Sequence, residues 1–188
     1  MPDQPLAYFI TYHTYGTWLH GAASGSVDCA HNEYGSPVLP PDALRHAKNR
    51  ERMTQEPYCL DTQRRAVVCD AIMSECRFRG WHLLALHVRS NHVHLVVVAD
   101  REPEFVMRCC KAHASKCLNQ AGLDAADRKR WTTHGSTVYL WSDEAVAEKI
   151  DYTLHQQGNV MTVYDGRAPS EPECQRETVQ SPRLALAF

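Results

Sequence analysis

The stretch WHLLALHVRSNHVHLVVVA, residues 81–99, holds two short β-forming runs separated by three polar residues. Runs of this length with so short a connection predict an antiparallel hairpin. Its second strand could be wholly aliphatic, yet it carries His92 and His94 two positions apart. Side chains at this spacing point to one face of a strand, so Val93 and Leu95 are expected to pack against helices on the other face. The hairpin therefore has a core face and a polar working face.

The segments around the hairpin predict the rest of the fold. Asp61 as an N-cap and Gly80 as a terminator predict a helix between them, and a second helix is expected over 102–122. Alternating aromatic and β-branched residues predict strands over 6–13 and 134–141. This order of elements predicts an α+β fold with a ferredoxin-like β-α-β-β-α-β antiparallel sheet, whose helices lie on one face.

A further helix is expected after the last of these strands. It begins at Ser142, a good N-cap followed by two acidic residues, and ends near Gly158. It carries Tyr152 and Gln156 four positions apart, which places both on one side of the helix. A phenol and an amide oxygen could then approach one point, although ordinary packing and solvent exposure explain the same pair.

The length of 188 residues predicts one domain, which we expect to span residues 1–165. A stretch rich in Gly, Ser, Asn and Pro forms a loop-rich insertion over about 20–60, with a short helix expected near 41–53. Long irregular insertions are usually functional or mobile. Residues 166–188 are polar and proline-bearing, and we expect them to form a flexible tail.

Composition limits the class of protein. No stretch approaches the roughly 18 apolar residues of a membrane span and no secretory signal is evident, so we expect a soluble, cytoplasmic protein without membrane association. The net charge of -2 argues against non-specific coating of nucleic acid but leaves room for a local basic groove. The eight cysteines contain no C-x-x-C pair, so most are expected to be reduced and buried. Cys29 and His31 make a weak zinc candidate, because a structural site needs about four ligands.

The histidine pair at positions 92 and 94 has two interpretations. Two imidazoles on one rigid strand suit a divalent metal ion and need little reorganisation to bind it. Alternatively, each ring caps a backbone group or lies in solvent, because an H-x-H pattern by chance is not rare in a chain with 11 histidines. The pair therefore needs a second motif to support the metal interpretation.

Together, His92-Val93-His94, Tyr152 and Gln156 resemble the motifs of the single-tyrosine HUH transposases, which include insertion-sequence and REP-associated types. In that family two histidines flank a hydrophobic residue on a central strand, and a later helix supplies the tyrosine. The segments FITYHTYGTWLHG and LHVRSNHVHLVVVA look most like the REP-associated tyrosine transposases. REP-associated members often carry Asn-Pro after the tyrosine, whereas Gln156 and Gln157 of this chain are closer to the insertion-sequence relatives.

The resemblance, which covers roughly residues 6–165, implies the HUH fold and a transposase that nicks and rejoins single-stranded DNA through a 5′-phosphotyrosine. Tyr152 is then the nucleophile, while His92, His94 and Gln156 hold Mg²⁺ or Mn²⁺. The expected partner is DNA with hairpin or palindromic ends, and a homodimer is compatible with the family. Cationic and aromatic side chains that could contact the DNA are Arg89, Arg108, Lys111, Lys116, Tyr12, Tyr15 and Trp18.

Two other functions stay open on sequence grounds. Sheets of this topology also serve as non-catalytic nucleic-acid-binding modules. A metal-dependent phosphodiesterase that uses water as its nucleophile would need the histidines but not the tyrosine. Cleavage of a DNA strand by a Tyr152→Phe variant, and the presence of a covalent adduct, separate these functions from a transposase.

Overall fold

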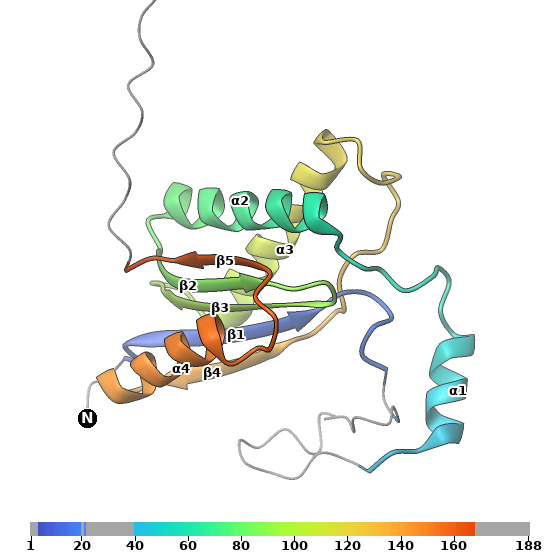
Figure 1. Cartoon of the computed structure of the whole chain (residues 1–188), viewed down its shortest axis with the longest axis horizontal. Helices are drawn as coiled ribbons and strands as arrows, with labels where there is room; N and C mark the ends of the chain where they lie inside the picture. Colours follow the sequence, from blue (N-terminus) through green and yellow to red (C-terminus); the bar gives the residue numbers. More distant parts are fainter. Residues whose placement is uncertain (1–3, 20, 22–39, 168–188) are drawn as a thin grey trace, which may run out of the picture.

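A five-stranded sheet is the centre of the structure, a computed structural model that describes residues 4–19, 21 and 40–167 (Figure 1). Its strands are β1 (Ala7–His13), β2 (His82–Val88), β3 (His92–Val98), β4 (Ser136–Leu140) and β5 (Thr162–Asp165). They lie in the order β4-β1-β3-β2-β5, and every neighbouring pair is antiparallel. The expected α+β class is confirmed.

Helices cover both faces of this sheet. The part of the chain that the structure describes contains α1 (Ala43–Glu51), α2 (Thr62–Arg79), α3 (Pro103–Gln120) and α4 (Asp143–His155). Figure 1 shows α2 and α3 on one face, α4 on the opposite face, and α1 standing away from the sheet. The face left open by the predicted β-α-β-β-α-β unit is thus occupied by a further helix.

Capping residues fix both ends of α2 and the start of α4 where the sequence predicted them, whereas α4 ends at His155 and not near Gly158. The Asp61 carboxylate accepts a hydrogen bond from the Arg64 backbone N–H at 2.8 Å, and Gly80 ends α2 with a φ of 71°. The Ser142 hydroxyl accepts from the Ala145 N–H at 3.2 Å and starts α4. Each cap satisfies a backbone group that the helix itself leaves unpaired.

The β3 strand divides the core into two clusters, as its alternating pattern predicts. Val93 and Leu95 are completely buried in the cluster that includes side chains of α2 and α3. Val96 points the other way and packs with Ile150 and Leu154 of α4. Because α4 is seated on the sheet by apolar contacts, its polar residues are held at fixed positions above the face that carries the histidines.

The structure adds one strand that the sequence analysis did not predict. β5 pairs with β2 at the edge of the sheet, and its four residues are too few to show a clear alternation. Within the expected insertion, the short helix is present as α1, and Tyr58 and Leu60 are buried. The predicted tail beyond residue 167, and Cys29 and His31, lie outside the described residues.

Two expectations about composition can be compared with the described residues. None of the helices there is long and apolar enough to cross a membrane. The described cysteines are all free thiols, and Cys69, Cys76 and Cys110 are buried. These three belong to the packing of α2 and α3, whereas Cys109 and Cys117 are half-buried and Cys59 is exposed, so burial was predicted for more cysteines than show it among the described residues.

Candidate functional site

The two histidines of β3 form a close pair on the face of the sheet that α4 covers. The ring centroids of His92 and His94 are 4.6 Å apart, with an interplanar angle of 74°. His94 is buried with 6% of its surface exposed, whereas His92 is partly exposed. A central strand thus holds both imidazoles side by side, with one edge of the pair open to solvent.

Hydrogen bonds to the Nδ1 atoms define which nitrogens remain available. The His92 Nδ1 lies 2.7 Å from the Asn91 side-chain oxygen, and because an amide oxygen can only accept, the ring donates from Nδ1. The His94 Nδ1 lies 2.7 Å from the hydroxyl of Thr11, its partner across the β1–β3 ladder. A ring that donates from Nδ1 keeps the lone pair of its Nε2 for a ligand, as outer hydrogen-bond partners arrange for metal-binding histidines. This holds for His92, and the Thr11 hydroxyl is able to accept from His94 in the same way.

Burial keeps both rings neutral. Together with the charge of the nearby His13, it lowers the pKa of His92 to about 4 and the pKa of His94 to about 3. A hydrogen bond to the Gln157 side chain raises both values but does not offset the burial. At neutral pH the pair can therefore accept hydrogen bonds or bind a cation, and it carries no charge that would repel one.

Tyr152 of α4 lies beside this pair in the same chain. Its ring centroid is 5.7 Å from that of His94 and 5.8 Å from that of Phe9, which itself stacks on His94 at 5.5 Å. The Lys149 ammonium group lies 5.6 Å from the Tyr152 ring centroid and 5.9 Å from that of Phe9. The structure thus brings together the predicted nucleophile, the predicted histidines and a positive charge.

Gln156, the predicted third ligand, is not brought to the pair. The helix ends at His155, and Gln156 is the exposed C-cap residue, whose Nε2 donates to the Asp151 carboxylate at 2.6 Å. Gln157 lies there instead: its side chain is close enough to His92 and His94 to raise the pKa of both, and its Nε2 donates to the Tyr152 carbonyl at 3.2 Å. The i to i+4 relation holds for the backbone, because the Gln156 N–H still donates to the Tyr152 carbonyl at 3.2 Å, but the Gln156 side chain is turned to Asp151.

His87 of β2 is a buried part of this site that the sequence analysis missed. Its Nδ1 donates to the Thr153 carbonyl of α4 at 2.9 Å, and its Nε2 accepts from the Met161 backbone N–H at 3.3 Å. The residue lies directly opposite His94 in the β2–β3 ladder. The predicted hairpin register could have revealed this third histidine, because cross-strand partners share a face.

The four cationic residues predicted to contact DNA do not share one surface. Arg89 lies near the pair, because its charge helps to lower the pKa of His92, and it donates to the Asn159 carbonyl at 3.2 Å. Lys111 is largely buried and donates to two backbone carbonyls, and burial lowers its pKa to about 8. Arg108 and Lys116 line a shallow pocket in the α2–α3 layer, which covers the other face of the sheet.

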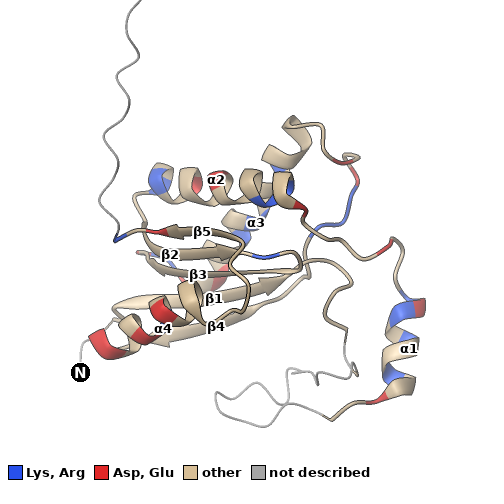
Figure 2. Cartoon of the chain, viewed as in Figure 1, with Lys and Arg blue, Asp and Glu red and all other residues tan. Residues whose placement is uncertain are grey.

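Charge is distributed unevenly over the helices (Figure 2). The acidic residues of α4 are Asp143, Glu144, Glu148 and Asp151. The basic residues of α1 and its C-cap are Arg45, Lys48, Arg50 and Arg52. A polyanion is therefore repelled by the outer surface of α4 and attracted toward the α1 end of the molecule.

The site offers few ligands for a metal. Among the described residues, no group of three or more His, Cys, Asp or Glu side chains is placed to hold an ion. The histidine pair with the Gln157 amide is therefore an open donor set, which differs from the closed four-ligand arrangement of a structural zinc site. Such a set leaves coordination positions for waters or a substrate oxygen.

No protein-family model matches the chain, and no curated protein matches its sequence. Among solved structures, a REP-associated tyrosine transposase bound to a REP hairpin is similar over 80% of this chain and 66% of that chain, with 14% identity and a TM-score of 0.46. A candidate transposase from Deinococcus radiodurans R1 is similar over 79% of this chain and 88% of that chain, with 13% identity and a TM-score of 0.44. The chain thus spans about two thirds of the length of the first structure. At these levels of identity the likeness concerns the fold alone.

Proposed function

We propose that the protein is a metal-dependent enzyme that nicks and rejoins single-stranded DNA, in the manner of the single-tyrosine HUH transposases. The ferredoxin-like sheet and α4 are its scaffold. The observation that carries this proposal is the position of Tyr152, whose ring lies 5.7 Å from the neutral His94 ring of the same chain. A phenol beside an open pair of imidazoles combines a nucleophile with a site for the phosphate that it attacks.

The donors of the site fit a divalent ion such as Mg²⁺ or Mn²⁺. His92 and His94 would hold the ion through their Nε2 atoms, and Gln157 would add its side-chain oxygen. When bound, the ion would neutralise charge that develops on a non-bridging phosphate oxygen. Neutral imidazoles with fixed Nδ1 partners are ready to bind without prior loss of a proton.

The chain's own residues position the reaction. The Tyr152 oxygen attacks the phosphorus, forming the phosphotyrosine bond and breaking the bond to the 3′ oxygen. The phenol proton is released, and the leaving 3′ oxygen takes up a proton to become a hydroxyl. At pH 7 an ordinary phenol with a pKa near 10 costs about 4 kcal/mol to ionise, so positive charge beside the phosphate is needed. Lys149 places such a charge next to the Tyr152 ring.

Because the phosphodiester energy is kept in the phosphotyrosine, a 3′ hydroxyl can attack it in reverse and restore a DNA strand. No nucleotide cofactor is required. A phosphate inside a regular duplex cannot easily reach a side chain seated against a sheet, so the substrate is a single strand or the unpaired flank of a hairpin. Arg89, at the hairpin turn, would contact its backbone; the effect of its charge on the pKa of His92 supports this role.

The test is a covalent adduct assay with single-stranded hairpin oligonucleotides. We expect a protein-DNA adduct that survives denaturation, requires Mg²⁺ or Mn²⁺, and is absent from Tyr152→Phe. The matched control is Tyr139→Phe, which alters an exposed tyrosine of β4 that bonds to Glu102. A normal adduct from Tyr152→Phe would exclude this nucleophile, and cleavage without any adduct would point to water as the nucleophile.

Tyr152 acts on the histidine pair of its own chain in this proposal, so an obligate homodimer is not required. Mixing Tyr152→Phe with His94→Ala tests this point, because each variant retains what the other lacks. We expect no adduct from the mixture. Restored adduct would mean that the tyrosine helix is exchanged between two copies of the chain.

A further inference from the structure

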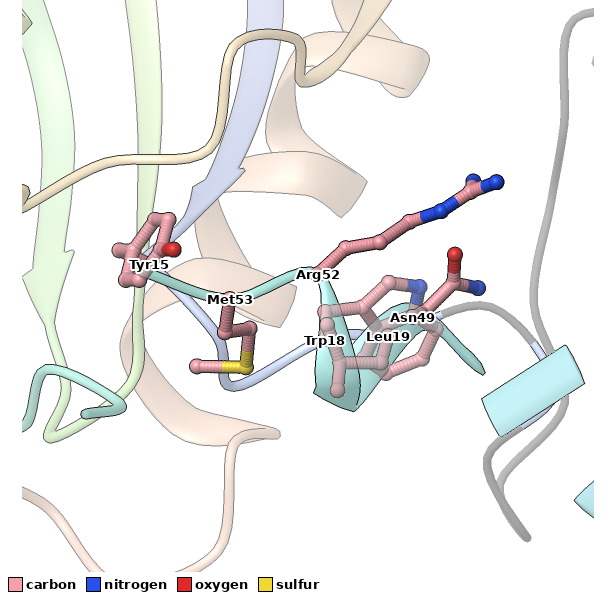
Figure 3. Close-up of a pocket in the computed structure, with 6 residues that line it drawn as sticks. All are labelled: Tyr15, Trp18, Leu19, Asn49, Arg52 and Met53. Atoms are coloured by element: carbon pink, nitrogen blue, oxygen red, sulfur yellow. The ribbon is translucent and has the colours of Figure 1, made fainter. Parts of the chain in front are cut away.

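A small pocket lies between the segment that follows β1 and the end of α1 (Figure 3). Its cavity of about 250 Å³ is lined by Tyr15, Trp18, Leu19, Asn49, Arg52 and Met53. This volume is below the range of about 300–1,000 Å³ that is typical of sites for drug-sized ligands. The pocket therefore suits one planar ring system with its immediate substituents.

Specific backbone contacts hold the walls of this pocket together. Gly16 has a φ of +74°, which favours glycine, and a Cβ there would lie 3.1 Å from the Pro57 Cα. The Tyr15 hydroxyl accepts a hydrogen bond from the Thr54 N–H at 3.1 Å. The segment after β1 is thereby fixed against the residues that follow α1, although the two are far apart in sequence.

A row of rings joins the pocket to the histidine pair. The Trp18 ring centroid lies 4.7 Å from that of His13, and the interplanar angle is 30°. His13 ends β1 opposite His92, and their ring centroids are 5.5 Å apart. A ligand in the pocket would therefore be a close neighbour of a group bound at the pair.

The chemistry of the lining combines an accessible aromatic ring with a cation and an amide. Trp18 is 37% exposed, and Arg52 is exposed at the C-cap of α1. Figure 3 shows the Arg52 side chain extending beside Asn49 and Trp18. Proteins bind single strands with such a set, because bases stack on aromatic rings while guanidinium groups attract phosphates. The basic α1 and acidic α4 direct a polyanion to this end of the molecule.

We propose that this pocket binds one unpaired nucleobase of the DNA strand whose phosphate is held at the histidine pair. The base stacks on Trp18, and Arg52 contacts an adjacent phosphate. The base lies within about two nucleotides of the reacting phosphate, given a spacing of about 3.4 Å per nucleotide in a duplex strand and more in an extended one. The assignment of DNA as the ligand rests on the proposed function. The existence of the pocket does not depend on that function.

The first experiment scans the DNA and leaves the pocket intact. The full-length Tyr152→Phe chain is titrated with single-stranded oligonucleotides in which one abasic nucleotide is moved along the sequence. We expect affinity to fall roughly 5- to 150-fold at one position near the cleavage site, as for the loss of one stacked base, and to change little elsewhere. Equal affinity for all abasic positions would overturn the proposal. So would an RNA strand of the same sequence that binds more tightly than the DNA.

The second experiment changes the pocket in the same Tyr152→Phe background. Trp18→Ala is expected to weaken binding of the intact strand by the same factor as the abasic nucleotide does. Its affinity should then no longer depend on whether that position is abasic. Trp18→Phe should bind the intact strand like the parent chain and remain sensitive to the abasic position. Trp141→Ala is the matched control, because Trp141 is 47% exposed but follows β4. Likewise, Arg52→Gln should reduce the salt dependence of binding more than Arg50→Gln.

The outcomes separate this pocket from the proposed catalysis. If the wild-type chain forms the covalent adduct but no abasic position has an effect that depends on Trp18, the proposal for the pocket is overturned and the proposed catalysis is not affected. If one abasic position has an effect that depends on Trp18 but no adduct forms, the pocket is supported and the proposed catalysis is overturned. Equal losses in Trp18→Ala and Trp141→Ala would show that the effect is not specific to the pocket.

Discussion

His87 faces His94 across the β2–β3 ladder, and the buried His87 ring links α4 to the segment that leads into β5. One imidazole thus satisfies the Thr153 carbonyl, next to Tyr152, and the Met161 N–H. The histidine pair and the tyrosine are therefore positioned by the same two strands. This relationship makes His87 a positioning residue for the proposed reaction.

Replacing His87 by Phe should separate positioning from binding. The variant keeps an aromatic ring but leaves two buried backbone groups unpaired, which costs about 1–3 kcal/mol each in unfolding free energy. We expect the rate of adduct formation to fall more than DNA affinity, and His87→Gln to recover part of the rate because an amide can donate and accept. Single-turnover kinetics and binding titrations measure the two effects. Equal losses in rate and affinity would contradict a positioning role.

The two adjacent glutamines provide a matched pair of variants. Gln157→Ala removes the amide that bonds to the histidine pair and should lower Mn²⁺ affinity at least about tenfold, the scale seen when partners around a metal site are removed. Gln156→Ala removes only an exposed bond to Asp151 and should bind Mn²⁺ like the wild type. Adduct yield as a function of Mn²⁺ concentration measures this difference. The reverse order would restore Gln156 as the metal ligand.

Thr11 offers a test of ring orientation that leaves all ligands in place. Thr11→Val keeps the side-chain shape but removes the partner of the His94 Nδ1, so the ring loses the hydrogen bond that orients it. We expect metal affinity to fall about 10- to 100-fold with little change in thermal stability. Thr137→Val on the neighbouring β4 strand is the control, because its hydroxyl bonds to Glu104. Unchanged affinity in Thr11→Val would show that this bond does not orient His94.

Stability should depend on Asp124, far from the histidine pair. Its buried carboxylate accepts hydrogen bonds from the Tyr58 hydroxyl at 2.6 Å, Arg64 Nε at 3.0 Å and Arg130 Nε at 3.1 Å. Removing one charged partner from a buried ion pair costs about 3–5 kcal/mol, so Asp124→Asn should lower the free energy of unfolding by that amount at pH 7. Asp127→Asn, an exposed change in the same connection, should have little effect.

The difference in the free energy of unfolding between wild type and Asp124→Asn should depend on pH. Burial by itself would raise the pKa of Asp124, but the Tyr58 hydroxyl and the two arginines lower it below 3.8 overall. A lowered pKa in the folded state means that the unfolded state binds the proton more readily, so the stabilisation is complete above pH 3.8 and is lost below it. Chemical denaturation of wild type and Asp124→Asn should therefore converge as the pH falls below this value. A constant difference down to pH 2 would contradict this account.

Much of the fold follows from local sequence. The hairpin, the caps at Asp61 and Ser142, and the alternation of β3 are properties of neighbouring residues, because capping and strand facing act over a few positions. The short distance between His92 and His94 also follows from local sequence, since both lie on one strand. The family resemblance also directed attention to Tyr152, which the structure places beside them.

Tertiary structure alone decided which side chains complete the site. The Gln156 side chain bonds to Asp151 and the Gln157 side chain lies near the pair, and helical spacing does not predict which of two adjacent side chains at a helix end does so. The pairing of β5 and the joining of Trp18 to His13 likewise depend on segments that meet only after folding. Sequence determines the faces of each element because those are set by backbone geometry. The meeting of distant elements is set by the packing of the whole core, which local patterns do not encode.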